Sequence, residues 1–154
     1  MRNAATWQSL ISSGIPLAAP MAVQAQLDAD GHLQLFAPLA PNRNDKGTGF
    51  GGSIAALATL AGWCEVLRLT DLHDLGPVEI VIQRGATEYL KPVESDFIAR
   101  AIPCHAEAAA AFAKILTRRG IGRLAVTVEI WAGNGMAARF DGEFVARTQK
   151  PSTT

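Results

Sequence analysis

The most apolar segment of the chain, residues 51–70, predicts a helix that is covered on most sides. From Gly51 to Leu67 the apolar residues lie almost all round a helical projection rather than along one stripe. A helix of that kind has to be enclosed by its surroundings. The segment is short for a membrane span and has charged residues close by, so we expect it to be the buried central helix of the fold.

The segments after this helix predict strands, because apolar and polar residues alternate in them. The clearest is 124–131, in which four aliphatic residues share one face: Leu124, Val126, Val128 and Ile130. The other expected strands cover residues 78–83 with 86–93, 96–102 and 136–147. We expect 78–83 and 86–93 to form one long strand with an irregularity at Gly85. Asp141-Gly142 is interpreted as a bulge, because a hairpin turn there would leave very short strands.

Two more helices and two more strands are predicted outside these segments. An amphipathic helix over 3–13 ends at Gly14 and has an apolar face of three residues: Trp7, Leu10 and Ile11. Strands are expected at 21–27 and 33–37, on either side of a turn at 28–31. An alanine-rich helix over 107–119 has its own apolar face: Phe112, Ile115 and Leu116.

One enclosed helix and several one-sided strands indicate an α+β fold. An antiparallel sheet with one apolar face can curl around a central helix, and each then buries the apolar surface of the other. That arrangement is the hotdog fold, and we expect it to form a single domain over residues 1–154. The sheet keeps an exposed edge, for instance along 86–93, which a second copy of the chain can cover. We therefore expect a homodimer or a dimer of dimers.

Composition and charge exclude several classes of protein. The chain has 154 residues, of which 49% are hydrophobic, and its 14 basic residues balance its 14 acidic ones. A neutral chain has no long-range field to attract a polyanion, so nucleic acid is not an expected partner. Cys64 and Cys104 lack the spacing of a disulfide framework or a metal site. Pro16 and Pro20 interrupt the only apolar stretch near the N-terminus, so we expect a cytoplasmic protein without a secretory signal or a membrane span.

A polar segment rich in glycine comes directly before the central helix. It contains four polar residues and three glycines: Asn42, Asn44, Asp45, Lys46, Gly47, Gly51 and Gly52. The first N–H groups of a helix have no partner within it, and the macrodipole adds partial positive charge there. Without side chains, the glycines can let a ligand carbonyl approach these groups. They can equally just shape a tight loop, with Thr48 or Ser53 capping the helix, and the residues alone leave both interpretations open.

The same segment resembles a known protein family. The matching residues are Ala37-Pro38-Leu39, Asn42, Asn44, Gly47-Thr48, Phe50-Gly51-Gly52-Ser53 and Leu57–Trp63. Together they resemble the YiiD C-terminal type of thioesterase, within the hotdog-fold acyl-CoA thioesterase superfamily. Residues 88–93 are similar to the strand that ends in Tyr-x-x-Pro in many hotdog thioesterases. The resemblance covers about residues 15–148.

The resemblance implies a substrate and an active site. The substrate would be a small acyl thioester, carried by coenzyme A or by a carrier protein, with no resident cofactor and no metal. In the wider phenylacetyl-CoA thioesterase-like group an Asn matches Asn44, and a His-Gly-Gly matches Phe50-Gly51-Gly52. There the N–H matching Gly51 binds the thioester oxygen, and a carboxylate stands at the position of Thr59. The chain departs from that pattern at Phe50 and at Thr59.

Each candidate residue has an expected role, which comes from the resemblance or, for Asp45, from its being the nearest carboxylate along the chain, and most have a structural alternative. Gly51, together with Gly52, would hold the carbonyl, Asn44 would orient water or the ligand, and Asp45 or Thr59 would assist. The alternative for Thr59 is a hydroxyl bonded to the carbonyl one turn earlier, and for Asp45 a turn-stabilising carboxylate. The other expected substrate-binding residues, which can also be packing residues, are Asn42, Thr48, Phe50, Ser53, Trp63, Glu88 and Tyr89.

Three functions follow, in order of preference. The first is hydrolysis of acyl thioesters at the start of the central helix. The second is a non-catalytic module that binds acyl thioesters, because Thr59 replaces the carboxylate. The third, a dehydratase or isomerase, ranks last because the loop contains no histidine.

Overall fold

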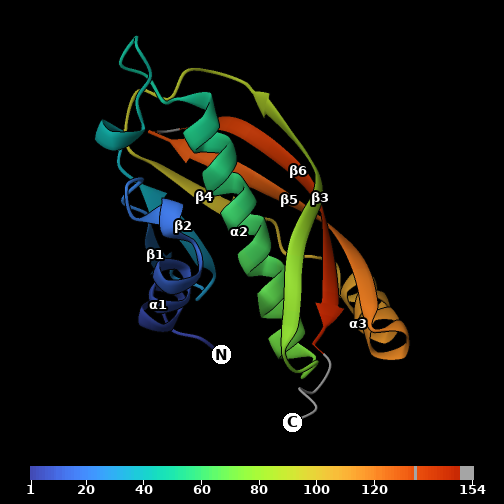
Figure 1. Ribbon diagram of the computed structural model, residues 1–154. Coiled ribbons are helices and arrows are strands. Elements are labelled where there is room, and N and C mark those ends of the chain that lie inside the picture. The colour runs from blue at the N-terminus through green and yellow to red at the C-terminus, as the bar shows by residue number, and fades with distance from the viewer. Residues whose placement is uncertain (134, 150–154) are drawn as a thin grey trace.

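A six-stranded antiparallel sheet wraps a long helix in the computed structural model, which describes residues 1–133 and 135–149 (Figure 1). The strands lie in the order β1-β2-β4-β5-β6-β3. Their bounds are β1 Gln24–Leu27, β2 Leu33–Ala37, β3 Val78–Tyr89, β4 Phe97–Ala101, β5 Ile121–Ala132 and β6 Gly135–Thr148. The helices are α1 Ala4–Gly14, α2 Gly51–Leu72 and α3 Ala106–Arg119, with short 3-10 turns η1 Pro16–Ala18 and η2 Ala40–Asn42. This arrangement confirms the predicted α+β hotdog fold.

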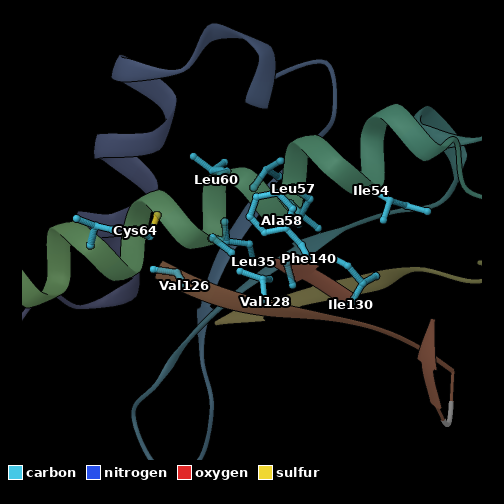
Figure 2. Close-up of a cluster of buried hydrophobic side chains, with 14 of the residues drawn as sticks. Leu35, Ile54, Leu57, Ala58, Leu60, Cys64, Val126, Val128, Ile130 and Phe140 are labelled. Carbon is cyan, nitrogen blue, oxygen red and sulfur yellow. The ribbon is translucent and has the colours of Figure 1, made fainter. Parts of the chain in front are cut away.

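The central helix α2 crosses the concave face of the sheet and packs against β3, β4, β5 and β6 (Figure 1). Leu57 and Ala58 are fully buried, and Figure 2 shows α2 lying over Val128 and Ile130 of the sheet. By length and composition alone α2 could cross a membrane, but 56% of its most apolar window is buried inside the protein. Its apolar surface is therefore used by the core, as the sequence predicts.

Two phenylalanines of β6 fill the space beneath α2, and three glycines make room for them. A Cβ on Gly62 of α2 would lie 2.6 Å from the Phe144 ring, and one on Gly85 of β3 would lie 2.9 Å from Phe140. A Cβ on Gly142 would meet both rings, at 2.6 and 2.8 Å. Gly85 and Gly142 face each other across the β3–β6 pair. These glycines are required by close packing in the core.

The structure corrects the predicted irregularities of the sheet. The register of β3 against β6 shifts between Ile82 and Arg84, one to three residues before the position predicted at Gly85. The pairing runs without interruption through Asp141 and Gly142, so the bulge predicted there is wrong. Gly142 serves the packing of two aromatic rings and does not bend the strand.

Some element boundaries and faces also differ from the prediction. Strand β3 ends at Tyr89 and excludes 90–93, consistent with the lost backbone donor at Pro92. Ile115 of α3 is 46% exposed, whereas Ala109 and Ala113 are buried beside the correctly predicted Phe112 and Leu116. The small alanine side chains let α3 approach the sheet closely. Part of the turn predicted at 133–135, Asn134, lies outside the described residues.

Candidate active site

Asn42 frames the loop that leads into α2. It is only 1% exposed, and its Nδ2 donates to the backbone carbonyls of Met21 at 2.9 Å and Pro38 at 2.8 Å. The backbone carbonyl of Asn42 accepts the N–H of Phe50 at 2.7 Å. Asn42 thereby ties the residue before α2 to the N-terminal layer. Because the side chain is sealed inside the protein, this framing role replaces the predicted substrate contact.

Asn44 closes the loop with its side-chain amide. Its Oδ1 accepts the backbone N–H groups of Lys46 at 2.9 Å and Thr48 at 3.1 Å, and its Nδ2 donates to Thr48 Oγ1 at 2.9 Å. A bridge between Arg43 and Gly49 completes the closure. An amide nitrogen carries two hydrogens, so Asn44 retains one N–H beyond its loop contacts. That hydrogen is the part of Asn44 that can serve a ligand.

The Asp45 carboxylate lies at the exposed tip of the loop. Its side chain is 82% exposed, and its Oδ1 lies 3.2 Å from Lys46 Nζ. The turn-stabilising role suggested by the sequence falls to Asn44 instead, which accepts both loop N–H groups. Lys46 Nζ donates to both Asp45 carboxylate oxygens, at 3.2 and 3.3 Å, and the remaining lone pairs of these oxygens are open to water.

The start of α2 presents backbone donors without a side-chain cap. Phe50 is the N-cap residue and makes no side-chain capping bond, and the first bond within the helix joins the Ile54 N–H to the Phe50 carbonyl at 3.1 Å. Neither Thr48 nor Ser53 caps the helix, contrary to one of the two interpretations of the sequence. The N–H groups of the first three helical residues point out of the helix together with the positive end of its dipole.

Two aromatic rings occupy the space that the glycines at the helix start leave open. Tyr89 donates its hydroxyl hydrogen to the Gly51 carbonyl at 2.8 Å, and a Cβ on Gly51 would lie 3.3 Å from the Tyr89 ring. A Cβ on Gly52 would lie 2.4 Å from the Phe50 ring. The expectation that these glycines leave an empty approach is therefore corrected. Tyr89 reaches Gly51 within one chain.

A groove of about 460 Å³ lies beside this helix start. The Gly49 N–H donates to the Val93 carbonyl at 2.7 Å, which draws the segment after β3 against the loop. The residues that line the groove are Thr48, Gly49, Gly51, Ile54, Tyr89, Leu90, Lys91, Pro92 and Val93. Six residues of this lining were not predicted as site residues: Gly49, Ile54, Leu90, Lys91, Pro92 and Val93. The last four belong to the same Tyr-x-x-Pro segment as Tyr89, which could have indicated them.

Of the predicted site residues, Thr48, Gly51 and Tyr89 line the groove, and the others do not. Thr59, Trp63 and Glu88 are among those others. Thr59 donates its hydroxyl to the Ala55 carbonyl at 2.8 Å, which is the structural alternative given for it. Trp63 is half-buried and packs against the core. Glu88 is exposed on β3 opposite Arg139 of β6. Eight residues along a helix correspond to about 12 Å, so the Thr59 backbone lies well away from Gly51.

A second cavity lies between α1, the β1–β2 turn and the C-terminal half of α2. Its volume is about 250 Å³, and Trp7, Leu33 and Cys64 belong to its lining. The polar part of its lining is an ion pair in which Arg68 donates to both carboxylate oxygens of Glu65, at 2.7 and 2.8 Å. Glu65 is buried, and this hydrogen bonding raises the pKa of the Arg68 guanidinium. The pair satisfies the Glu65 charge and locks the second half of α2.

The β1–β2 turn gathers a possible ligand set for a cation. Oxygen or nitrogen atoms of Asp28, Asp30 and His32 lie within 4.8 Å of one another. Asp28 already accepts the backbone N–H groups of Asp30 and His32, and the bond from His32 is the main cause that lowers the pKa of its carboxyl. The alternating spacing of these residues around Gly31 is the signal that could have found this trio. The turn bonds explain their proximity.

Comparison with known proteins assigns the chain to a family. The model of the family described as "Putative thioesterase (yiiD_Cterm)" matches residues 4–148. The chain belongs to the YiiD C-terminal thioesterase family. That match begins further toward the N-terminus than the resemblance found in the sequence and includes α1. No curated protein gives a significant match.

Solved structures share the fold of this YiiD C-terminal family member over almost its whole length. A thioesterase from Shewanella oneidensis, described as putative, is 27% identical with a TM-score of 0.81, covering 94% of this chain and 97% of the other. A thioesterase from Haemophilus influenzae (EC 3.1.2.-) is 16% identical with a TM-score of 0.73, covering 100% and 96%. A Bacillus halodurans protein, whose crystal structure contains CoA, is 20% identical with a TM-score of 0.66, covering 94% and 93%.

Proposed function

We propose that this protein hydrolyses acyl thioesters of coenzyme A or of an acyl carrier in the groove beside Gly51. The observation that carries the proposal is an uncapped helix start bordering a groove in a chain of a thioesterase family. The CoA bound by the Bacillus halodurans protein of similar fold supports a CoA ester as substrate.

The proposed chemistry uses backbone donors rather than a buried acid or base. The N–H groups of Gly51 and Gly52 bind the thioester oxygen and stabilise the negative charge that develops on it. A water oxygen forms a bond to the carbonyl carbon, its proton passes to a carboxylate, and the carbon–sulfur bond breaks to release the thiol. Of the two predicted assistants, Asp45 has a free acceptor, whereas the Thr59 proton is held by Ala55. Asp45 is therefore the proposed base, and the remaining N–H of Asn44 orients the water.

A thiol-release assay tests the proposed reaction. Purified protein is incubated with short, medium, long and aromatic acyl-CoA esters, and free thiol is followed with a chromogenic reagent. Burial raises the pKa of both protein thiols, most strongly for Cys64, so they contribute a slow background. A Cys104→Ser variant and a blank without substrate measure that background. We expect release from at least one class of ester, and no release from any of them would contradict the proposal.

A non-catalytic thioester-binding module is the second candidate. Thr59 stands where the related group has a carboxylate, and its hydroxyl is bonded to the helix. Calorimetric titration with the same esters separates the two functions. Saturable binding without thiol release, unchanged by Asn44→Ala, would favour the binding module over the hydrolase.

We also propose that the protein forms a homodimer through β3. Within the described residues this 12-residue strand is hydrogen-bonded to β6 alone and forms one edge of the sheet. Val81 is 60% exposed and Ile82 39%, which is unusual for branched apolar residues on a long strand. An uncovered apolar edge of this kind favours pairing with another strand. A second copy is the proposed partner, with closed twofold symmetry.

Sedimentation at micromolar concentration tests the dimer. We expect a species of twice the 16.3 kDa chain mass, and Val81→Lys should shift it toward the monomer because a charge on an edge strand opposes pairing. Ile115→Lys is the matched control, since Ile115 is also exposed but lies on α3. A wild-type monomer that keeps full activity on dilution would contradict the proposed dimer.

A further inference from the structure

Tyr89 is bonded to a peptide group at the centre of the proposed site. It is the last residue of β3, it is 52% exposed, and its hydroxyl donates to the Gly51 carbonyl oxygen at 2.8 Å. That carbonyl and the N–H of Gly52 belong to the same peptide unit. The Tyr89 hydroxyl therefore binds the carbonyl end of the Gly51–Gly52 peptide, and the N–H at the other end is a proposed donor to the substrate.

A hydrogen bond to an amide oxygen changes the amide N–H. The peptide unit is planar and conjugated, so a donor at the oxygen draws electron density away from the nitrogen. Linked hydrogen bonds strengthen one another in this way. The bond also fixes the plane of the Gly51–Gly52 peptide and with it the direction of the Gly52 N–H. Both effects favour binding of a negatively charged oxygen over a neutral carbonyl.

The packing at Gly51 supports a specific role for this contact. A Cβ at position 51 would lie 3.3 Å from both Cζ and Oη of Tyr89, closer than most real Cβ contacts. The absence of a side chain at Gly51 therefore lets the phenol hydroxyl reach the helix carbonyl. The half-exposed Tyr89 ring is stabilised less by burial than a core aromatic residue is. The hydrogen bond therefore supplies much of the stabilisation of the Tyr89–Gly51 contact.

We propose that Tyr89 is a positioning residue that orients and polarises the Gly51–Gly52 peptide, so that the Gly52 N–H stabilises the oxyanion formed during hydrolysis. This inference rests on the proposed function. It gives Tyr89 a task different from substrate contact, the role expected from the sequence. Tyr89 acts through the backbone of α2, and the transition state gains more from it than the bound substrate does.

The Tyr89→Phe variant tests this role, because it keeps the ring and removes only the hydroxyl. We expect kcat to fall about fivefold, the usual effect of one hydrogen bond, while KM stays the same. In a ¹H–¹⁵N spectrum of the protein without ligand, the Gly52 amide proton should move upfield. The matched control is Thr117→Val, which removes a hydroxyl bonded to a helix carbonyl, that of Ala113 at 2.9 Å, in α3. That control should leave kcat and the Gly52 resonance unchanged.

Each result separates this inference from the function on which it rests. Wild-type turnover with an unchanged kcat in Tyr89→Phe overturns the inference, and so does a Gly52 amide proton that does not move. A lower kcat together with an equal rise in KM also overturns it, because the lost interaction would then be substrate binding. Absence of thiol release from the wild-type protein contradicts the proposed function instead.

Discussion

Replacing Gly51 with valine is expected to lower kcat/KM for thioester hydrolysis about a hundredfold while the fold stays intact. A Cβ alone would press on Tyr89 at 3.3 Å, and the two γ-carbons of valine would displace the phenol and cover the N–H groups at the helix start. Loss of an oxyanion donor costs on the order of 3 kcal/mol in the barrier, which corresponds to about two orders of magnitude. Gly51 is only half-buried at the first position of α2, so the free energy of unfolding should change little.

Steady-state kinetics measure the expected loss of kcat/KM, and circular dichroism shows whether the fold stays intact. Gly14→Val is the matched control, because Gly14 ends α1 and a Cβ there would meet nothing within 4 Å. Gly51→Ala should have a smaller effect, and part of that effect should disappear in the Tyr89→Ala background, where the ring is gone. A folded and fully active Gly51→Val variant would show that the start of α2 is not the site.

Gly62→Val is expected to lower the free energy of unfolding by about 3 kcal/mol, the upper range for overpacking a buried site. A Cβ at Gly62 would lie 2.6 Å from Cζ of Phe144, and that residue is 1% exposed and has no free space to enter. Helix propensity alone predicts the opposite sign, because glycine is the less favourable residue inside a helix. The prediction therefore separates packing from propensity.

Urea denaturation followed by circular dichroism measures how far Gly62→Val lowers the free energy of unfolding. The expected fall in the midpoint of thermal unfolding is about 9 °C for a chain of this length. Shortening the opposing ring with Phe144→Leu should recover part of the loss in the double variant, since it frees space beneath α2. Gly14→Val again serves as the control and should shift the midpoint little. Equal stability of the wild-type and Gly62→Val proteins would show that the packing of Phe144 is not tight.

The periodicity of the sequence predicted the fold well because burial follows it directly. Leu124, Val126, Val128 and Ile130 are all buried, as their alternation predicts. The errors occur where packing at a distance decides the local structure. The bulge predicted at Asp141-Gly142 is absent because the glycine makes room for two rings, and no pattern within β6 alone indicates which glycine bends a strand and which accommodates a neighbour.

A groove lies beside the helix start that the sequence indicates, but the contacts of the predicted site residues were not predictable. Thr48, Gly49 and Gly51 border the groove with Tyr89, whereas Asn44, Asp45 and Gly52 do not belong to its lining. The sequence could not show that the Asn42 amide points inward and bonds the carbonyls of Met21 and Pro38. Pro38 is close to Asn42 along the chain, but Met21 is brought next to it only by the fold. Nor could the sequence show that Tyr89 fills the space at Gly51, because that contact spans 38 residues.

The position of β6 has a consequence for how the chain is made. Synthesis starts at the N-terminus, so β6, which lies between β5 and the edge strand β3, is made after both of these neighbours. Until Gly135–Thr148 leaves the ribosome, β3 lacks the neighbour to which it is bonded, and α2 lacks Phe140 and Phe144 beneath it. The apolar face of α2 that these two rings cover is therefore completed only after β6 has been synthesised.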